Sequence, residues 1–418
     1  MSQSKVCLQI PIVHGKESAL SAVLNTYGNP ASADSAFPFQ QFSKIHFARW
    51  FIVPGTIIKG KPIPASVMYA ANIDETPTAH LEALAKKAGP ALDTIFSHCK
   101  DYPTEEITEQ SRLSYLKAHS LKTQAFYVGA PKRTVEQIFN EAELQDAVRK
   151  IVKQEKSTSR QSPQAILNKI RTELAKSERW DWVQKQPFTL PGIKWVRGFF
   201  FAIAVLITLI PVLLLTVLIH FFYENRLEPL GLDINQIDPE WLQKLKMQED
   251  IIYQNQLTQV FEIKPGLRKV FLHYILWFTN QLANIVAVKG DLMGTPTIHF
   301  ARWVLIDQGR RFIFLSNFDG SYDEYLGDFI DNNGWGLNAI YSNSKGYPRT
   351  KYVFWGGSYK IGEFLAWGRH YQIPTQAWYS AYPHFGLPQI ISRSRLRVGL
   401  FSRRTLDSEQ IEDLLRRV

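Results

Sequence analysis

A six-residue segment, IHFARW, occurs twice in this chain of 418 residues, at 45–50 and again at 298–303. Further matches follow in the same order, namely NID (72–74) with NFD (317–319) and TQAFY (123–127) with TQAWY (375–379). Collinear matches of this kind indicate a duplicated domain, with one copy over about 45–131 and the other over about 298–383. Two long copies are not a solenoid, which stacks three or more short units.

A long apolar run, 198–222, separates the two copies and contains one ionisable residue, His220. As a helix at about 1.5 Å per residue, this run would reach roughly 37 Å, which exceeds the roughly 30 Å of a bilayer's hydrocarbon core. We therefore expect a membrane anchor here. Pro211, near the middle, leaves open whether the run spans the membrane once or folds back as a re-entrant hairpin.

The sidedness of this anchor can be inferred from basic residues, which are denser before the run than after it: Lys176, Arg179, Lys185, Lys194 and Arg197 precede it. The positive-inside rule then places the N-terminal side in the cytoplasm. A single crossing would put the second copy outside, whereas pairing of the copies needs both on one side. A weaker apolar stretch, 267–288, reads as an amphipathic helix in the membrane interface, or as a segment that crosses back. We expect both copies to be cytoplasmic.

Strand and helix patterns in both copies follow the order β-α-β-β-α-β of a ferredoxin-like unit. Strands are predicted at 45–53, 67–73 and 124–128 in the first copy, and at 298–306, 311–318 and 376–381 in the second. Ser321 and Glu324 have capping-box spacing and predict the start of a helix. The expected fold class is α+β, with two ferredoxin-like repeats forming one pseudo-symmetric α/β barrel of the dimeric type, plus a membrane-anchoring helical segment.

The domain organisation follows from these elements and from the polar, Lys- and Gln-rich composition between them. Six segments are expected: a first ferredoxin-like repeat (1–144), a polar helical linker (145–195), the membrane anchor (196–223), a linker with an interfacial amphipathic helix (224–297), a second ferredoxin-like repeat (298–402) and a charged tail (403–418).

Polar residues on the predicted hairpins are the candidate ligand-binding residues. A turn at Gln308-Gly309 places residue 302 opposite 315 and residue 300 opposite 317, so that one sheet face carries Arg302, Asn317 and Asp319. The first copy offers the equivalent residues Arg49, Asn72 and Asp74. An arginine on an apolar strand needs a partner. Two interpretations stay open, an Arg–Asp pair satisfied inside the sheet and a site for an anion or carboxylate.

Histidines and aromatic residues supply the remaining candidates. His299 is expected on the opposite face from Arg302, with Trp303, and it and His370 are the candidate metal or haem ligands. The second copy also carries a dense aromatic set, including Trp335, Trp355, Trp367, Trp378, Tyr379 and Tyr382. These side chains either fill a core or line a pocket for a flat apolar ligand, with Trp378 and Tyr379 as candidate contacts.

The composition of the chain limits the classes of binding partner that we expect. The net charge of +10 favours anionic partners, and the chain lacks zinc-finger spacing and RNP-like motifs, so we expect membrane lipid and not nucleic acid. Cys7 and Cys99 are far apart with no CxxC, which fits a reducing compartment. No HExxH, GxSxG, P-loop or Rossmann fingerprint is found, so the sequence assigns no reaction. Beyond pairing of the two copies, a homo-oligomer is left open.

Four segments carry a family resemblance: IHFARW, LSNFDGSYDEYLGDFID, GLNAIYSNSKGYPRT and PTQAWYSAY. They resemble a bacterial family of membrane-associated proteins that is grouped with the dimeric α/β-barrel superfamily, which also contains dye-decolorising peroxidases and chlorite dismutases. The resemblance covers roughly 249–383. Those peroxidases carry a GxxDG motif with a distal Asp, and here 316–320 reads SNFDG, with Ser316 at the first Gly position and Asp319 at the Asp position.

Two functions follow as expectations. The first is a membrane-anchored α/β-barrel protein that binds an apolar or anionic small ligand, or a lipid, at the membrane surface. The alternative, implied by the resemblance at the level of the fold alone, is a haem-dependent peroxidase-like oxidoreductase. In that case Arg302 and Asp319 would be the catalytic candidates beside the haem, and His299 or His370 would bind its iron.

Overall fold

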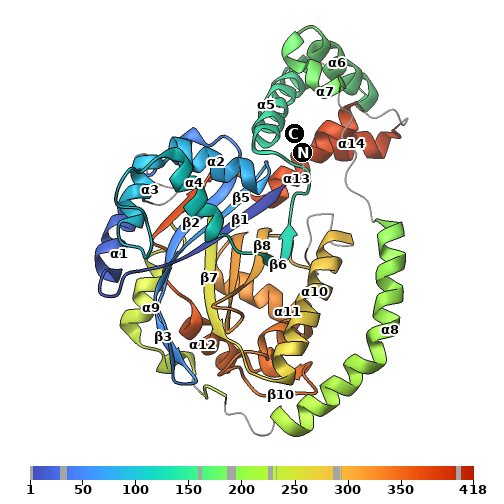
Figure 1. Ribbon diagram of the computed structural model, residues 1–418. Coiled ribbons are helices and arrows are strands. Elements are labelled where there is room, and N and C mark those ends of the chain that lie inside the picture. Colours follow the sequence, from blue (N-terminus) through green and yellow to red (C-terminus); the bar gives the residue numbers. More distant parts are fainter. Residues whose placement is uncertain are drawn as a thin grey trace.

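Two four-stranded antiparallel sheets form the centre of the molecule, and helices cover their outer faces (Figure 1). The computed structural model describes residues 3–28, 35–158, 162–185, 194–224, 229–231, 233–285, 292, 294–401 and 406–418. The protein is therefore of the α+β class, as the sequence predicts. The predicted register of the second hairpin is confirmed, since Arg302 lies opposite Leu315 and Phe300 opposite Asn317.

The first sheet has the strand order β1 (Ser4–Pro11), β5 (Ser66–Ile73), β2 (Ile45–Val53) and β12 (Ala377–Ser380). Four helices contribute to the outer layer of this half: α1 (Glu17–Asn25), α2 (Pro77–Lys87), α3 (Gly89–Phe96) and α4 (Glu109–Ala118). Thr76 caps α2 with its side chain and Pro77 takes the first helical position, as expected for this sequence. A small hairpin, β3 (Thr56–Ile58) and β4 (Lys61–Ile63), connects β2 to β5.

The second sheet has the order β6 (Thr123–Val128), β8 (Ile298–Ile306), β9 (Arg311–Asp319) and β7 (Gln254–Glu262). Its outer face is covered by α10 (Leu267–Ile285), α11 (Tyr322–Tyr341) and α12 (Ile361–Tyr371). Near them lie α9 (Pro239–Lys246) and the short strands β10 (Thr350–Lys351) and β11 (Trp355–Gly356). The predicted capping box of Ser321 and Glu324 begins α11.

Each sheet is completed by a strand from the other copy of the repeat. Strand β6 belongs to the first copy but pairs with β8, and β12 belongs to the second copy but pairs with β2. Apolar side chains from both sheets meet in the space between them, among them Phe51, Met68, Val304 and Leu315. Neither copy therefore forms a complete four-stranded sheet by itself, whereas the sequence analysis expected a whole ferredoxin-like repeat within 1–144 and another within 298–402.

The segment 224–297, expected to be a linker with an interfacial helix, supplies β7 and α10 to the second sheet and its covering layer. Helix α10 carries apolar residues three and four positions apart, and Phe271, Leu272, Ile275 and Leu276 are buried in the core. The interpretation as a linker is corrected, because the apolar face of this helix packs on the protein's own sheet. Residues 286–288 of the predicted stretch lie outside the described residues.

The segments expected as a polar linker and a charged tail pack together as a small helical body. It comprises α5 (Val135–Thr158), α6 (Pro163–Ala175), α7 (Asp181–Lys185), α13 (Leu387–Leu400) and α14 (Ser408–Arg416). Ile170 of α6 is fully buried there together with Leu396 and Leu400 of α13. Parts of both predicted segments, 159–161, 186–193 and 403–405, lie outside the described residues.

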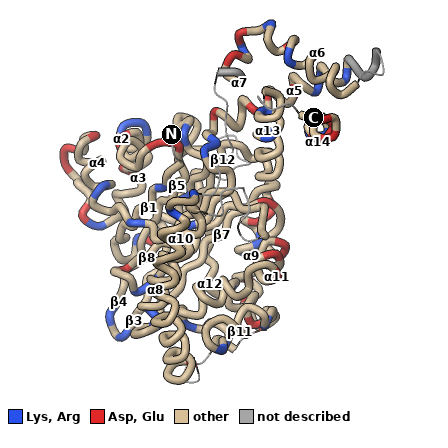
Figure 2. The backbone as a smooth tube through the Cα atoms, turned by 90° about the vertical axis from the view of Figure 1, so that its right-hand side faces the viewer, with Lys and Arg blue, Asp and Glu red and all other residues tan. Residues whose placement is uncertain are grey.

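Helix α8 (Trp195–Ile219) contains the long apolar run and lies along the outside of α10 (Figures 1 and 2). With the π-helical turn His220–Glu224 it forms a 30-residue helix, the one helix within the described ranges that is long and apolar enough to cross a membrane. Pro211 lies inside α8 and does not end it. Most of its large apolar side chains are exposed.

The C-terminal end of this helix is fastened to the second half through Glu224, which is buried. Its carboxylate accepts hydrogen bonds from Thr350 Oγ1 (2.7 Å), Val353 N (2.7 Å), Tyr352 N (2.8 Å) and Arg268 Nη2 (3.4 Å), and lies 2.7 Å from His220 Nδ1. A buried carboxylate needs such partners. This end of α8 is therefore part of the folded domain.

Lys264, next to this cluster, has a buried ammonium group that donates to Ser342 O at 2.9 Å. Burial, and secondly the charge of Arg268, lower its pKa to about 7. In an unfolded chain the value is about 10.4. Between these two pH values the unfolded chain binds more protons than the folded protein, so the free energy of unfolding rises with pH over this window.

We predict that Lys264→Met weakens this pH dependence. The melting temperature of the wild type should rise by several degrees between about pH 7 and pH 10, whereas that of Lys264→Met should rise less and be higher at the acidic end. Thermal unfolding in detergent at a series of pH values measures this, with Lys269→Met as the control. Parallel curves for wild type and Lys264→Met would contradict the assignment.

Candidate functional site

The guanidinium of Arg49 crosses from the first sheet to the second and is buried between them. It makes five hydrogen bonds there, with Asn317 Oδ1 (2.5 Å), the carbonyl oxygens of Ser316 (2.8 Å) and Leu257 (2.9 Å), Thr258 Oγ1 (2.9 Å) and Gln256 Oε1 (3.0 Å). Its acceptors are thus amide, carbonyl and hydroxyl oxygens, and the pair with a carboxylate considered from the sequence is not among these bonds.

Arg302 makes the corresponding crossing in the opposite direction. Its guanidinium donates to Asn72 Oδ1 and to Val6 O (2.8 Å) in the first sheet. Asn72 and Asn317 are equivalent positions of the repeat, and Val6 occupies in its sheet the place of Leu257 in the other. The two arginines therefore form a reciprocal pair of links between the halves.

Burial lowers the pKa of both guanidinium groups. The pKa of Arg49 falls to about 9, because of burial first and the charge of Arg302 second. Burial lowers the pKa of Arg302 to about 10. Both side chains remain protonated near neutral pH, so the space between the sheets holds two positive charges that depend on hydrogen bonds for their stability.

Two His–Asp pairs lie at one end of the same space. His46 Nε2 is 2.8 Å from Asp74 Oδ1, and His299 Nε2 is 2.8 Å from Asp319 Oδ1. The second oxygen of each Asp accepts a backbone N–H at a helix start, from Val135 of α5 (2.7 Å) and from Leu387 of α13 (2.5 Å). Asp74 therefore connects the first sheet to α5, which follows the exchanged strand β6. Asp319 connects the second sheet to α13, which follows the exchanged strand β12.

The predicted face of His299 is wrong. A β-bulge between Ile298 and Phe300 inserts an extra residue into the strand. His299 consequently lies on the side of Asp319 and approaches Phe47 of the first sheet at 5.3 Å between ring centroids. Strict alternation along the strand would have placed it with Trp303 in the outer core.

The other candidates divide between this space and the outer faces. Trp378 lies inside, where its Nε1 donates to Asn317 Oδ1 at 3.3 Å. Tyr379 points to the outer side of the first sheet and stacks on Phe39 at 4.9 Å. His370 lies on α12 with its ring edge-on to Tyr371, and burial lowers its pKa. Among the predicted ligand-binding residues, only Tyr379 is thus separated from the inner cluster.

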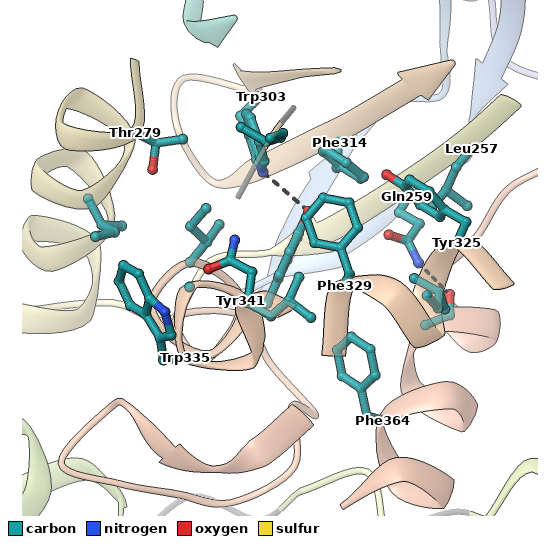
Figure 3. A pocket seen from close by; sticks show the side chains of 18 of the residues that line it. Leu257, Gln259, Thr279, Trp303, Phe314, Tyr325, Phe329, Trp335, Tyr341 and Phe364 are labelled. Atoms are coloured by element: carbon teal, nitrogen blue, oxygen red, sulfur yellow. Dashed lines mark hydrogen bonds between the residues drawn. The ribbon is translucent and has the colours of Figure 1, made fainter. Parts of the chain in front are cut away.

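An apolar pocket lies elsewhere, between the outer face of the second sheet and helices α10, α11 and α12 (Figure 3). Its volume is about 840 Å³, with the open space at its mouth included. Aliphatic and aromatic side chains dominate its wall, among them Leu257, Trp303, Phe314, Phe278, Ala283, Leu326, Phe329, Trp335 and Trp367. Trp335, one of the lining residues, is 39 % exposed, so the wall of the pocket reaches the protein surface there.

Most polar groups in the pocket wall already have partners within the protein. Trp303 Nε1 donates to Tyr341 Oη at 3.2 Å, and Gln259 Nε2 donates to Gly368 O at 2.9 Å. Asn333 differs, because its Oδ1 is buried and has no hydrogen-bond partner among the described residues. Asn333 sits at a kink of α11, with φ −144° and ψ 30°, beside Gly336. A Cβ at position 336 would lie 2.3 Å from this oxygen.

Sequence reasoning named part of this pocket. Trp335 and Trp367 belong to the aromatic set for which a pocket was one of two interpretations. The wall from α10 was missed, since its apolar residues suggested a membrane interface. Asn333 was also missed, because no pattern in the sequence predicts the kink that directs its side chain.

Comparisons with protein-family models, with curated proteins and with solved structures found no match. The class of this protein is therefore described by its fold and by its pocket. It is an α+β protein with two sheets that exchange strands, an apolar pocket in the second half, and an exposed apolar helix long enough to span a membrane.

We predict that the two Asn residues of the reciprocal links differ in their contribution to stability. Asn72→Leu should lower the free energy of unfolding by about 1–3 kcal/mol, because Arg302 then keeps one acceptor among the described residues. Asn317→Leu should cost less, since Arg49 keeps four hydrogen bonds and the other bond lost, from Trp378 Nε1, is long at 3.3 Å. Thermal unfolding in detergent gives the ranking. Equal losses, or the reverse order, would contradict this account of the links.

Proposed function

We propose that this protein holds an elongated apolar molecule with a hydrogen-bond donor, such as a lipid alcohol, in the pocket of its second half, at a membrane to which α8 attaches it. The observation that carries the proposal is the apolar pocket itself with the free acceptor of Asn333 in its wall. Ligand sites are characteristically apolar with a few placed polar groups. A buried oxygen without a partner is costly, and a hydroxyl or N–H of a ligand would satisfy it.

The surroundings of the pocket support the proposal that the ligand enters it from the membrane. Phe278 lines the pocket, and its ring lies 5.4 Å from that of Phe201 on α8. The apolar helix is therefore one side chain away from the pocket wall. We further propose that both halves lie in the cytoplasm, because the anionic lipids of the cytoplasmic leaflet attract the basic residues that precede α8.

For the fold we propose a single pseudo-symmetric barrel, similar to that of the dimeric α/β-barrel superfamily. The exchanged strands β6 and β12 and the reciprocal crossings of Arg49 and Arg302 support it, because they relate the two halves by the same operation in both directions. Association into a homo-oligomer is not needed for this arrangement.

A haem-dependent peroxidase receives no support from the pocket. Among the described residues, the side chains that line the pocket include neither His nor Cys. His299 is engaged by Asp319 between the sheets, and His370 is directed toward Tyr371 outside the lining. The residues present do not fit the binding of haem iron here, and we assign no reaction through it.

Photocrosslinking with a diazirine-bearing hexadecanol, applied to the protein in liposomes, tests the proposed function. Saturable labelling is expected on pocket residues of α10 and α11, with non-saturable labelling on exposed α8. Ala283→Phe and Leu282→Trp fill the pocket and should reduce the saturable labelling at least tenfold. Asn284→Phe, which adds the same ring one residue along on the exposed side of α10, is the matched control. Unchanged labelling in both filling variants would refute the site.

The buried Oδ1 of Asn333 leads to a second prediction, which concerns the hydroxyl group of the ligand. Excess hexadecanol should compete with the photoprobe more strongly than hexadecane does, because one hydrogen bond to a buried oxygen contributes about 1 kcal/mol, or roughly a fivefold difference. In Asn333→Leu the two competitors should become equal. An advantage of the alcohol that survives this substitution would mean that its hydroxyl group binds elsewhere.

A further inference from the structure

Helix α8 is attached to the second half along its length, and not at one end alone. Near its start, Lys194 N donates to Ile285 O at 3.5 Å, at the end of α10. In the middle, Thr208 Oγ1 lies 3.0 Å from Tyr274 Oη of α10. Toward the end, Thr216 and Ile219 are buried, and Ile219 belongs to the core of the second half.

This attachment conflicts with a helix that crosses the bilayer. A crossing helix of this length occupies the whole hydrocarbon thickness of about 30 Å. The domain beside it would then enter the hydrocarbon with α10, including exposed His273 and the polar residues Asn280 and Gln281. Burying such groups in lipid is costly, whereas a helix that lies parallel to the surface leaves them near water.

The side of α8 that faces away from the domain is apolar over more than a narrow stripe. Exposed large residues occur in every turn, from Trp195 to Phe222. At about 100° per residue they cover roughly half of the helix circumference. A helix that packs on the core of a globular protein typically has an apolar stripe about 100° wide. Exposed apolar surfaces this extended mark a contact with a membrane or with another protein.

The polar residues at the start of this surface fit a lipid leaflet. Lys194 and Arg197 are exposed at the start of the helix, next to Trp195, which is 77 % exposed. Tryptophan and basic side chains favour the headgroup region, where anionic lipids attract the charges. No other charged residue follows in α8, and the run is uniformly tan in the view that faces it (Figure 2).

We propose that α8 lies in the plane of the membrane, embedded in the acyl region of one leaflet, so that the chain attaches to the bilayer without crossing it. Both copies of the repeat then lie on the same side of the membrane. The occupant of the exposed face is lipid. This inference does not depend on the ligand of the pocket, because it concerns the orientation of the helix alone.

Spin labels on the full-length protein in liposomes test the orientation. Single cysteines replace Phe199, Ile207, Leu214 and Phe221, which are exposed along the length of α8. The native Cys7 and Cys99 are buried and do not compete for the label. All four labels should report similar depths of about 5–10 Å below the headgroups. Shallow labels at 199 and 221 with labels near the bilayer centre at 207 and 214 would overturn the proposal.

The same labels separate lipid from a second copy of the chain. Lipid contact gives high accessibility to oxygen at all four positions, with Thr216→Cys as the buried control on the domain side. Low oxygen accessibility together with strong spin–spin broadening would mean that another chain covers this face, which also overturns the proposal.

Cysteine labelling in sealed vesicles tests independently whether the segments before and after α8 lie on the same side of the membrane. Ala175→Cys and Gln243→Cys place exposed thiols before and after α8. An impermeant maleimide added outside should modify both to the same extent in each preparation. Modification of one with protection of the other would show that the chain crosses the bilayer.

Discussion

Two buried guanidinium groups that must be hydrogen-bonded constrain everything around them. Arg49 and Arg302 each leave their own sheet and find their acceptors on the other. A charge in such a place is tolerated only while its bonds are intact. The two sheets can therefore neither slide nor separate without exposing a charge to an apolar interior. This fixes the space between them, and with it the outer faces on which the helices pack.

Although the two sheets are linked in the same way, the residues that cover their outer faces differ between the two halves. Trp50 in the first half is covered by Phe37, with 5.8 Å between ring centroids, and is fully buried. Its equivalent, Trp303, borders the pocket of the second half. Leu8 of β1 likewise corresponds to Gln259 of β7, which also lines the pocket. The inner links are thus alike in the two halves, whereas their outer layers differ, and the pocket lies in the outer layer of the second half.

Local patterns in the sequence predicted local structure well. The register around Gln308-Gly309 and the helix starts at Thr76 and Ser321 follow from turn and capping chemistry, which acts over a few residues. The bulge at His299 escaped prediction because one inserted residue changes a face without changing composition. The strand exchange escaped for a different reason, since an alternating pattern specifies a face and not the neighbouring strand.

Hydropathy was informative about α8 and misleading about α10. Both stretches are apolar, but α10 has its apolar residues on the periodic face that packs on the sheet, with polar residues between them. Composition alone does not distinguish a helix that faces lipid from one that faces a sheet. The position of α8 beside α10 depends on contacts such as that of Thr208 with Tyr274, which join residues from separate helices. The same limit applies to Asn333, whose role arises from a kink.

The exchanged strands also determine when each sheet can be completed during synthesis on the ribosome. The first sheet needs β12, which follows β2 far along the chain, so the edge of β2 stays open until residues 377–380 have emerged. Until then the unpaired edge of β2, rich in aromatic residues, is available to any strand that it meets. Contacts between such distant segments form slowly. Early association of α8 with lipid would hold nascent chains apart during this interval and so limit their aggregation.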